Sequence, residues 1–396
     1  MDILMDTEIP KNGIFRIETH RSGPFTFQIG VDLEKIDPLL NRVKDAHSRF
    51  SSVPILPDVA TQLEKEVVVS SVFGTNTIEG GTLTEEETAG VINGISEVKE
   101  EKERRVINIK YAYEKAESFA DECVKSGKGI TILMQETMMT DLHAIITDGL
   151  KHPHNEPGKY RDNQKGQLTK VGDAEHGGVY TPPKCRDDIE ILIKHFLQWV
   201  NSEPVCKLPP LLRAPLVHFY FERIHPFWDG NGRVGRVLEA IVLKCAGFKY
   251  APFALSRYYL EHIDEYFTVF NLARKNEEQK DPYPNTVFIE FFLEGMLSVL
   301  NSLHDKVNGI LAFMLYENIL NTFLQQKKIN IRQFTIINNL LPRGIEHDLS
   351  YIQTQPWYSG LYSKLTPKTK SRDLKNLEKN KLITITKNKK VRLMVP

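Results

Sequence analysis

Apolar residues recur every three or four positions over most of the chain up to about residue 325, which is the spacing of amphipathic helices. The pattern predicts helices over residues 57–79, 84–122, 131–149, 186–202, 207–224, 233–246, 258–275 and 284–325. We therefore predict a mostly α-helical protein.

One stretch interrupts this helical pattern. Residues 158–184, GKYRDNQKGQLTKVGDAEHGGVYTPPK, are rich in glycine, polar and β-branched residues and contain a Gly-Gly and a Pro-Pro pair. Turn-forming residues of this kind between short β-prone runs are typical of a hairpin. The sequence therefore predicts a small β-hairpin flap on the helical body.

The pattern changes again near residue 321. NIRQFTIINNLL predicts a short helix, and LTPKTKSRDLKNLEKNKL predicts a second one with Leu374, Leu377 and Leu382 on its apolar face. ITITKNKKVRLMV then alternates as two strands around a Lys-Asn turn. Two helices followed by a basic hairpin are typical of a winged-helix (α+β) domain, which we predict over residues 321–396.

Charge is unevenly distributed along a chain whose net charge is zero. Residues 321–396 carry 15 basic and 4 acidic side chains, a net of +11, and the preceding 320 residues carry 36 and 47, a net of −11. The basic residues of the second predicted helix, its approach and the hairpin are Lys364, Lys368, Lys370, Arg372, Lys375, Lys379, Lys381, Lys387, Lys389, Lys390 and Arg392. A basic unit of this kind suits DNA phosphates, and a solvated basic face or a protein-docking or dimerisation module fits the same pattern.

Nothing in the sequence predicts export or a membrane anchor. The four cysteines are scattered without a CxxC pair, and the N-terminus, MDILMDTEIPKNG, lacks the basic and apolar regions of a signal peptide. No uninterrupted apolar run reaches the ~20 residues of a membrane span, since FIEFFLEGMLSVL is broken by Glu290 and Glu294. We expect a cytoplasmic protein.

The most informative stretch is HPFWDGNGRVGR, residues 225–236, which joins the helical patterns LLRAPLVHFYFERI and RVGRVLEAIVLKCAG. Gly230-Asn231-Gly232 suits a strained backbone whose N–H groups converge on one point, and the helix that follows adds the positive end of its dipole. This combination predicts an anion site, most naturally for phosphates. Arg233 and Arg236 share one face of that helix, and their guanidinium groups suit phosphate oxygens.

Two further side chains complete the chemistry of this loop. Asp229 directly precedes the glycines, and a single carboxylate beside phosphates is the usual protein ligand of Mg²⁺. His225 is the one group in the loop that can accept a proton near neutral pH. Each residue alone has a structural explanation, as a turn or a cap. Together they predict a phosphoryl- or nucleotidyl-transfer site.

The stretch resembles the signature of the Fic domain family, H-x-F-x-(D/E)-G-N-G-R-x-x-R, without departure. The resemblance implies transfer of AMP from ATP to a Ser, Thr or Tyr hydroxyl of a target protein, or of the protein itself. It implies His225 as the general base, Asp229 as the Mg²⁺ ligand and Arg236 as the residue that orients the γ-phosphate. The nucleotide-binding residues it implies are Gly230, Asn231, Gly232, Arg233, Val234, Gly235 and Arg236.

The same resemblance extends to the flap, through GKYR and the closing YTPP of residues 158–184. In the family this flap aligns the target segment by strand addition. The tip, DAEHGG, is longer than the family pattern, which leaves its target contacts open. A homodimer is also expected from the family.

A second motif, TNTIEGG at residues 75–81, follows an apolar helical segment. Thr75 and Glu79 share a helix face, and Gly80 suits the position just past a helix end. A glutamate there is disfavoured by the helix dipole if exposed, so a cation partner would offset its charge; a tolerated surface glutamate is the alternative. The motif resembles the Fic inhibitory motif, (S/T)-x-x-x-E-(G/N), which implies that Glu79 pairs with Arg236 and blocks the γ-phosphate.

The donor nucleotide is less firmly indicated. LSRYYLEHIDEYFTVFNLAR matches the family's adenine-side helix in outline, and Tyr266 would border the base, although an aromatic stripe at this spacing also fits a core helix. A family asparagine near the end of this helix is replaced around Arg274. Base choice therefore stays open.

These patterns divide the chain into four parts: an N-terminal helical region with the inhibitory motif (1–104), a Fic core (105–300), a linking helix (301–320) and the winged-helix-like domain (321–396). The predicted activity is Mg²⁺-dependent protein adenylylation with ATP as co-substrate. The alternatives are a Fic transferase with another donor, such as UTP, GTP or CDP-choline, an enzyme that removes AMP, and a DNA-binding regulator with a nucleotide-sensing core.

Overall fold

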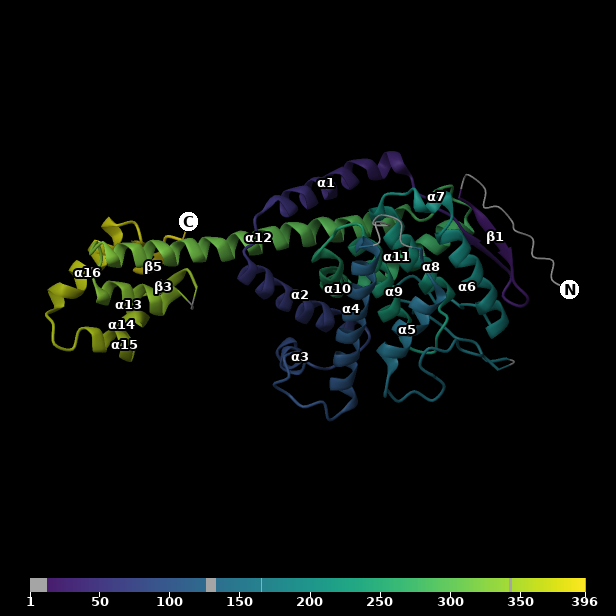
Figure 1. Ribbon diagram of the computed structural model, residues 1–396, viewed down its shortest axis with the longest axis horizontal. Helices are drawn as coiled ribbons and strands as arrows, with labels where there is room; N and C mark the ends of the chain where they lie inside the picture. Colours follow the sequence, from purple (N-terminus) through teal and green to yellow (C-terminus); the bar gives the residue numbers. More distant parts are fainter. Residues whose placement is uncertain (1–12, 126–132, 165, 342–343, 396) are drawn as a thin grey trace. The chain divides into compact units, whose positions relative to one another are not determined.

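The computed structural model describes residues 13–125, 133–164, 166–341 and 344–395 (Figure 1). The chain forms two compact units, residues 1–304 and 305–396. This division is coarser than the four parts predicted from the sequence, whose boundaries stay predictions.

The first unit is helical apart from one small hairpin. Its elements are β1 (Phe15–Glu18), β2 (Pro24–Phe27), α1 (Leu33–Ser52), α2 (Pro57–Ile78), α3 (Glu85–Ile92), α4 (Glu101–Lys125), α5 (Glu136–Thr147), α6 (Arg186–Val200), α7 (Glu203–Cys206), α8 (Pro210–Ile224), α9 (Asn231–Cys245), α10 (Ala251–Glu261) and α11 (Ile263–Glu278). Helix α12 (Thr286–Gln325) begins in this unit and continues into the second. The expectation of a mostly α-helical protein is confirmed.

Helices α8 and α9 form the centre of the first unit. They pack against each other, and α4, α5 and α10 surround α9, while α2 packs on α10 (Figure 1). Both central helices are buried on nearly all sides, and the buried residues of α9 include the charged side chains Arg233, Arg236 and Glu239. The loop between them, residues 225–230, is therefore held by buried helices at both ends.

Several elements differ from the sequence prediction. The helix expected over 84–122 is two helices, α3 and α4, because Asn93 and Gly94 (φ +71°) end the first one. The helix expected over 258–275 is likewise broken at His262 (φ −121°, ψ 41°) between α10 and α11. Helix α1 and the β1–β2 hairpin were not predicted.

The predicted hairpin over 158–184 is also reduced in the structure. Its described residues, which exclude 165, are irregular backbone with a single antiparallel bridge between Val171 and Tyr180. Arg161 is completely buried and pins the segment at both ends, since Nε donates to the His225 carbonyl at 2.7 Å and Nη2 to the Pro183 carbonyl at 2.7 Å. The flap is thus fixed to the active-site loop by an arginine rather than by a strand ladder.

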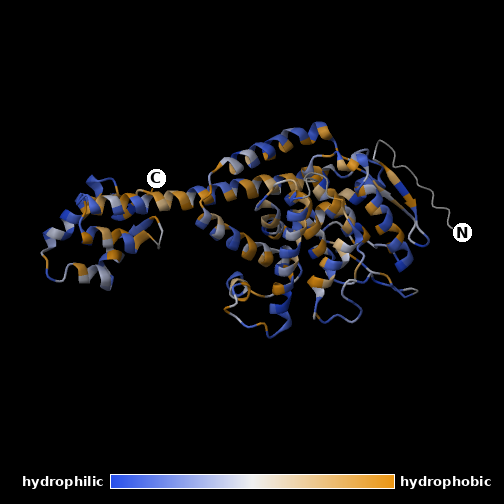
Figure 2. Ribbon diagram, viewed as in Figure 1, coloured by the Kyte–Doolittle hydropathy of each residue, from blue (hydrophilic) through white to orange (hydrophobic). Residues whose placement is uncertain are grey.

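Helix α12 is the one described helix that is long and apolar enough to cross a membrane by length and composition (Figure 2). Of its most apolar 18-residue window, however, 61% is buried inside the protein. Burial of this kind is typical of a core helix.

The second unit combines short helices with a three-stranded antiparallel sheet. Its elements after α12 are α13 (Ile331–Leu340), β3 (Glu346–Asp348), α14 (Leu349–Thr354), α15 (Pro356–Leu361), α16 (Pro367–Lys379), β4 (Ile383–Ile385) and β5 (Lys390–Leu393), with strand order β3-β5-β4. The two predicted helices and the hairpin correspond to α13, α16 and β4–β5. The additional elements β3, α14 and α15 lie between them, and the winged-helix assignment stays a prediction.

A buried carboxylate organises this second unit. Asp373 on α16 accepts hydrogen bonds from Arg332 Nε (3.0 Å), Gln333 Nε2 (3.0 Å) and Tyr362 Oη (3.1 Å). These donors come from α13 and from the segment after α15. Asp373 therefore joins three parts of the unit that are distant in sequence.

We expect Asp373→Ala to destabilise the second unit by about 3–5 kcal/mol, because the buried donors would lose their acceptor. Hydrogen exchange of residues 331–395 in the full chain measures this loss. Glu346→Ala is the matched control, since Glu346 is an exposed acid in a surface pair with Lys390 and such pairs contribute about 0–1 kcal/mol. Equal protection in the two variants would contradict the role of Asp373.

Candidate active site

Two left-handed residues bound the loop between α8 and α9. His225 ends α8 with φ 49° and ψ 60°, and Gly230 precedes α9 with φ 84°. A left-handed conformation costs a non-glycine residue about 1–2 kcal/mol, and such strain is concentrated at functional sites. The reversal at His225 turns the loop away from α8, and the one at Gly230 feeds it into α9.

The loop is held by side chains that fill its interior. Asn231 accepts a hydrogen bond from the Phe227 amide and donates one to the Phe227 carbonyl, both at 2.9 Å. Phe227 is fully buried and stacks on His143 with ring centroids 3.6 Å apart. The Asn231 side chain is therefore a clamp on the loop.

His143 on α5 ties the loop to the start of the flap. Its Nδ1 accepts from the Gly158 amide at 2.9 Å, so Nε2 carries the proton that it donates to the Asp229 carbonyl at 3.0 Å. Burial lowers the pKa of His143 to about 4, which keeps the ring neutral in this tautomer. This residue lay outside every sequence motif and was missed.

Helix α2 places Glu79 opposite the start of α9. The helix ends in a Schellman motif, in which the Gly81 amide donates to the Asn76 carbonyl (2.8 Å) and the Gly80 amide to the Thr77 carbonyl (3.0 Å), with Gly80 at φ +79°. Glu79 is thereby the C-cap residue. Thr75, one turn earlier, is buried and bonds Tyr113 and Ser256, which anchors this end of α2.

The Glu79 carboxylate lies directly over the first turn of α9. A Cβ atom at Gly232 would come 2.3 Å from Glu79 Oε1, so only glycine allows this approach. The amides of a first helical turn have no carbonyl partner within the helix and attract anions. A carboxylate of the protein thus occupies the anion site that the sequence predicts for phosphate.

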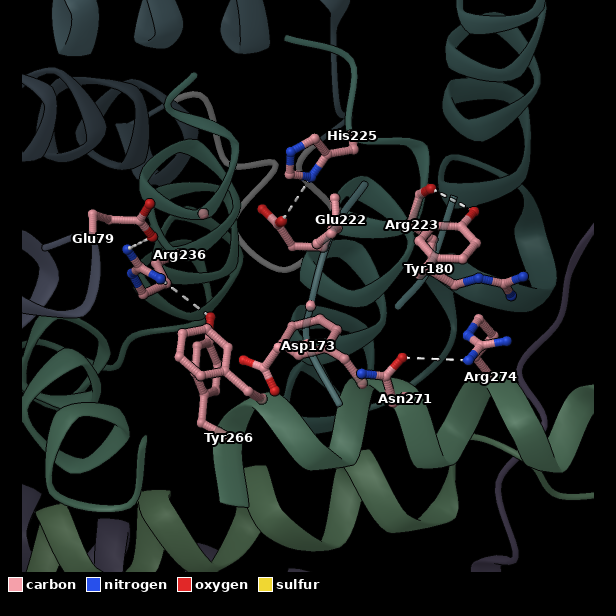
Figure 3. Close-up of a pocket in the computed structure, with 15 residues that line it drawn as sticks. Glu79, Asp173, Tyr180, Glu222, Arg223, His225, Arg236, Tyr266, Asn271 and Arg274 are labelled. Atoms are coloured by element: carbon pink, nitrogen blue, oxygen red, sulfur yellow. Dashed lines mark hydrogen bonds and ion pairs between the residues drawn. The ribbon is translucent and has the colours of Figure 1, made fainter. Parts of the chain in front are cut away.

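Arg236 holds the same carboxylate. Its Nη2 lies 2.8 Å from Glu79 Oε1, so the pair predicted from the sequence is present (Figure 3). Burial alone would raise the pKa of Glu79, but the positive charges of Arg236 and Arg233 outweigh it and hold this pKa below its ordinary value. Arg105 on α4, which sequence reasoning missed, adds a bond from Nη2 to the Glu79 carbonyl at 2.8 Å.

Asp229 and Arg233 form a second ion pair beside the first. Arg233 Nη2 lies 2.7 Å from Asp229 Oδ1. The Nε and Nη1 groups of Arg233 are buried and have no hydrogen-bond acceptor among the described residues. These unused donors are suited to an anionic oxygen, because a buried N–H without an acceptor is costly.

Asp229 is the residue that could hold a metal ion. Its side chain is 36% exposed, and its carboxylate stands beside the anion site. Among the described residues, no group of three or more His, Cys, Asp or Glu side chains could bind a metal without further ligands. One carboxylate beside phosphates and water is the donor set that Mg²⁺ takes in nucleotide sites, so Asp229 fits this ion.

His225 lies at the edge of the same site. Its Nδ1 is 3.4 Å from Glu222 Oε2, one turn back on α8 (Figure 3). This contact is an ion-pair distance and does not form a hydrogen bond, since His225 Nδ1 has no hydrogen-bond partner among the described residues. Glu222 was missed by sequence reasoning, although its position three residues before His225 on a helix was a usable signal.

These groups surround a cavity of about 330 Å³ (Figure 3). One end is polar, with Glu79, Gly232, Arg236, Glu222 and His225. The rest of the lining comes from the flap, α8 and α11 and combines four aromatic side chains with polar ones: Val171, Gly172, Asp173, Tyr180, Arg223, Tyr266, Phe267, Phe270, Asn271 and Arg274. An anion site that opens into a partly aromatic cavity can bind phosphates at one end and a flat base or sugar at the other.

The flap closes one wall of this cavity and is fastened to α11. His176 lies between two carboxylates, with Nδ1 2.9 Å from Asp173 and Nε2 3.2 Å from Asp264. Its carbonyl accepts from Asn271 Nδ2 at 2.9 Å. Hydrogen bonds to Asp173 and Asp264 raise the pKa of His176 above its ordinary value.

The predicted nucleotide-binding residues do not all face the cavity. Val234 is fully buried, and a Cβ at Gly235 would come 2.8 Å from His218, so both pack into the interior of the unit. Tyr266 lines the cavity as predicted, but its hydroxyl is directed at Arg236 Nη1, 3.2 Å away (Figure 3).

Comparisons with known proteins agree with this geometry. The curated protein adenylyltransferase Fic of Nematostella vectensis is 26% identical over 242 residues, covering 60% of this chain and 51% of its own length. That of Aedes aegypti is 25% identical over 239 residues, covering 60% and 43%. The chain spans about half the length of these curated relatives.

Solved structures share the fold. A Fic family protein from Desulfovibrio desulfuricans is 21% identical with a TM-score of 0.53, covering 90% of this chain and 95% of its own. Fic-1 (residues 134–508) from C. elegans is 20% identical with a TM-score of 0.52, covering 70% and 74%. The Fic/DOC family model matches residues 133–243, which include the whole loop and the first turns of α9. Residues 133–243 of the chain therefore match the Fic/DOC family.

Proposed function

We propose that the protein transfers AMP from ATP to a hydroxyl group of a target protein and that Glu79 restrains this activity. The observation that carries the proposal is the Glu79 carboxylate over Gly232, bonded to Arg236. A built-in anion at a helix N-terminus competes with phosphate oxygens for the same N–H donors. The relatives named protein adenylyltransferase Fic support the choice of reaction.

The side chains of the loop supply the chemistry of transfer. His225 Nε2 takes the proton of the target hydroxyl, whose oxygen attacks the α-phosphorus while pyrophosphate leaves. The Glu222 carboxylate, 3.4 Å from the opposite nitrogen of His225, would stabilise the ring once it carries the proton. The α9 amides and the Arg233 and Arg236 guanidinium groups orient the phosphates.

Mg²⁺ held by Asp229 would neutralise phosphate charge. The pairing of Asp229 with Arg233 keeps that carboxylate next to the phosphates. Burial would raise the pKa of Asp229, but Arg233, the Gly230 amide and Arg105 together hold this pKa below its ordinary value, so the carboxylate is ionised.

Two other reactions use the same residues. A donor such as UTP, GTP or CDP-choline would meet the same His225 and phosphate site, and a panel of labelled donors separates these cases. Removal of AMP from a target would give Glu79 a part in activating water. Release of label from a premodified target distinguishes removal from transfer.

We expect Glu79→Gly to raise AMP transfer by about tenfold or more, because Arg236 would lose the competing carboxylate and a charged hydrogen bond is worth about 1.5–3 kcal/mol. Label from α-labelled ATP, on the protein itself and on lysate proteins, measures transfer. Glu79→Gln is the matched control, since it keeps the size of the side chain but removes its charge. Transfer should vanish when His225→Ala is added to Glu79→Gly.

Unchanged transfer in Glu79→Gly would contradict the restraint by Glu79. Absence of label from all forms, including Glu79→Gly, would contradict ATP as the donor and move the proposal to the other nucleotides.

The flap should open more readily as pH rises. Protonated His176 bridges two carboxylates, and because its folded pKa is raised, this attachment is complete below its ordinary pKa of ~6.5 and is lost as pH rises through the raised value. Hydrogen exchange at residues 171–178, corrected for intrinsic rates, should show more protection at pH 6 than at pH 8. His176→Ala should remove this difference, whereas Glu175→Ala, a neighbouring exposed change, should keep it.

A second candidate function concerns the second unit. Helix α16 carries the exposed basic side chains Lys368, Arg372, Lys375 and Lys379, and the β4–β5 hairpin carries the exposed Lys387, Lys389 and Arg392. We propose that this basic surface contacts DNA phosphates.

The full chain should then bind duplex DNA with an affinity that falls steeply between 50 and 200 mM salt, roughly tenfold or more for a few phosphate contacts. Charge reversal of Lys375 and Lys379 should weaken this binding, and charge reversal of Lys151 in the first unit should not. DNA binding that does not depend on the salt concentration, or that is unchanged by the charge reversals on α16, would contradict this assignment.

A further inference from the structure

Behind Arg236 lies a chain of hydrogen bonds that neither the loop motif nor the inhibitory motif includes. Arg236 Nη1 donates to Tyr266 Oη at 3.2 Å, and the same hydroxyl lies 3.2 Å from His218 Nε2. His218 Nδ1 lies 2.9 Å from Glu239 Oε2, and Tyr259 donates to Glu239 Oε1 at 2.9 Å. The chain draws on α8, α9, α10 and α11, and none of its members is more than 3% exposed.

The direction of every bond in this chain is fixed by its ends. Carboxylate oxygens only accept, so the proton of His218 must be on Nδ1, facing Glu239. Nε2 is then an acceptor, and Tyr266 must donate its only O–H to it. The guanidinium of Arg236 only donates, so it takes the remaining lone pair of Tyr266.

No other arrangement satisfies all the groups. If both nitrogens of His218 carried a proton, Nε2 would donate to the Tyr266 hydroxyl, to which Arg236 already donates. The Tyr266 proton would then have no acceptor among these partners, which is costly in a buried site. Burial raises the pKa of both Tyr266 and Tyr259, so each remains a neutral phenol with one proton to donate.

The packing around the chain leaves little room for movement. The rings of Tyr266 and Tyr259 stack with centroids 4.7 Å apart at 16°. Gly235 lies one residue before Arg236, and a Cβ there would come 2.8 Å from His218 Cδ2. The absence of a side chain at position 235 therefore lets His218 reach the turn of α9 that carries Arg236.

The other contacts of Arg236 show why this support matters. Nη2 is bonded to Glu79 at 2.8 Å and faces the Thr75 carbonyl at 3.5 Å, and Nε has no acceptor among the described residues. Once Glu79 moves away, Tyr266 is the closest protein acceptor left to the guanidinium. Its hydroxyl would then decide where the free N–H groups of Arg236 point.

We propose that Tyr266, oriented by His218 and Glu239, is a positioning residue that keeps Arg236 aimed at the terminal phosphate of a bound nucleoside triphosphate. This inference rests on the proposed function, because it assigns the partner of Arg236 in that same site. It gives the Tyr266 ring two tasks: it lines the nucleotide cavity, and its hydroxyl holds the arginine.

The test compares two nucleotides that differ only in the phosphate that Arg236 contacts. Binding of ATP and ADP with Mg²⁺ is measured by calorimetry for Glu79→Gly and for Glu79→Gly with Tyr266→Phe. The second change keeps the stacked ring and removes the hydroxyl. We expect the affinity for ATP to fall by about tenfold or more while that for ADP stays within about twofold, as loss of a hydrogen bond to a charged group predicts.

Tyr258→Phe in the Glu79→Gly background is the matched control, since Tyr258 is the neighbouring tyrosine on α10 and lies outside the chain of hydrogen bonds. It should leave both affinities unchanged. Glu239→Gln should lower the ATP-to-ADP affinity ratio in the same direction as Tyr266→Phe, because it removes the charge that fixes the His218 proton. Thermal unfolding of each variant shows that it is folded.

An equal loss of ATP and ADP binding in Tyr266→Phe would mean that the hydroxyl supports the cavity as a whole, and would overturn the proposal. An unchanged ratio in Tyr266→Phe or in Glu239→Gln would overturn it as well. The proposed function has a separate outcome: if Glu79→Gly binds ATP with the expected dependence on Tyr266 but transfers no AMP, the transfer reaction fails and the positioning role stands.

Discussion

The ion pair between Glu79 and Arg236 is the contact on which the rest of the site depends. It joins the end of α2 to the first turns of α9, two elements separated by 157 residues, inside a largely buried pocket. A buried ion pair is stable only when hydrogen bonds satisfy both partners, and removal of one partner leaves the other uncompensated. Here the hydroxyl of Tyr266 supports Arg236, and Arg105 holds the main chain at Glu79 through its carbonyl.

Three glycines allow the backbone to form this contact. Gly80 ends α2 so that Glu79 is the capping residue, Gly230 starts α9 in a left-handed conformation, and Gly232 admits the carboxylate where a Cβ would collide with it. The unfavourable position of a glutamate at a helix C-terminus is offset because the carboxylate faces the N-terminus of another helix. The negative end of the α2 dipole and the positive end of the α9 dipole are thus joined by the Glu79 side chain.

The loop could be predicted from its local pattern, and the resemblance to the Fic family implied the pairing of Glu79 with Arg236 that the structure contains; the anion site stays a prediction. His143 and Arg105 could not be found in this way, since each reaches the site from a distant helix and lies in no quoted motif; Arg161 lies in the GKYR stretch, but its bonds to His225 and Pro183 depend on the fold. The role of the Tyr266 hydroxyl could not be predicted for the same reason. Helical periodicity indicates only that the ring lines a cavity or packs in a core, and its contact with Arg236 depends on the fold.

Similar limits explain the errors in secondary structure. The break between α3 and α4 depends on Asn93 and Gly94 within a sequence whose apolar spacing continues across them. The flap has the composition of a hairpin, but its backbone is held by Arg161 and His176 to neighbouring elements and forms one bridge. In both cases a few side-chain or turn contacts override a local pattern.

The way in which α2 ends also limits how the restraint can be released. The Schellman bonds and the buried contacts of Thr75 fix the backbone of the helix up to its last turn. Glu79 can therefore move only by rotation about its side-chain bonds. A nucleotide that displaces the carboxylate therefore needs to rotate one side chain and need not move the helix. If Tyr266 positions Arg236 as proposed, that rotation would expose an arginine that is already oriented, and the loss of one charged hydrogen bond would be the chief cost to the binding of the proposed ATP substrate.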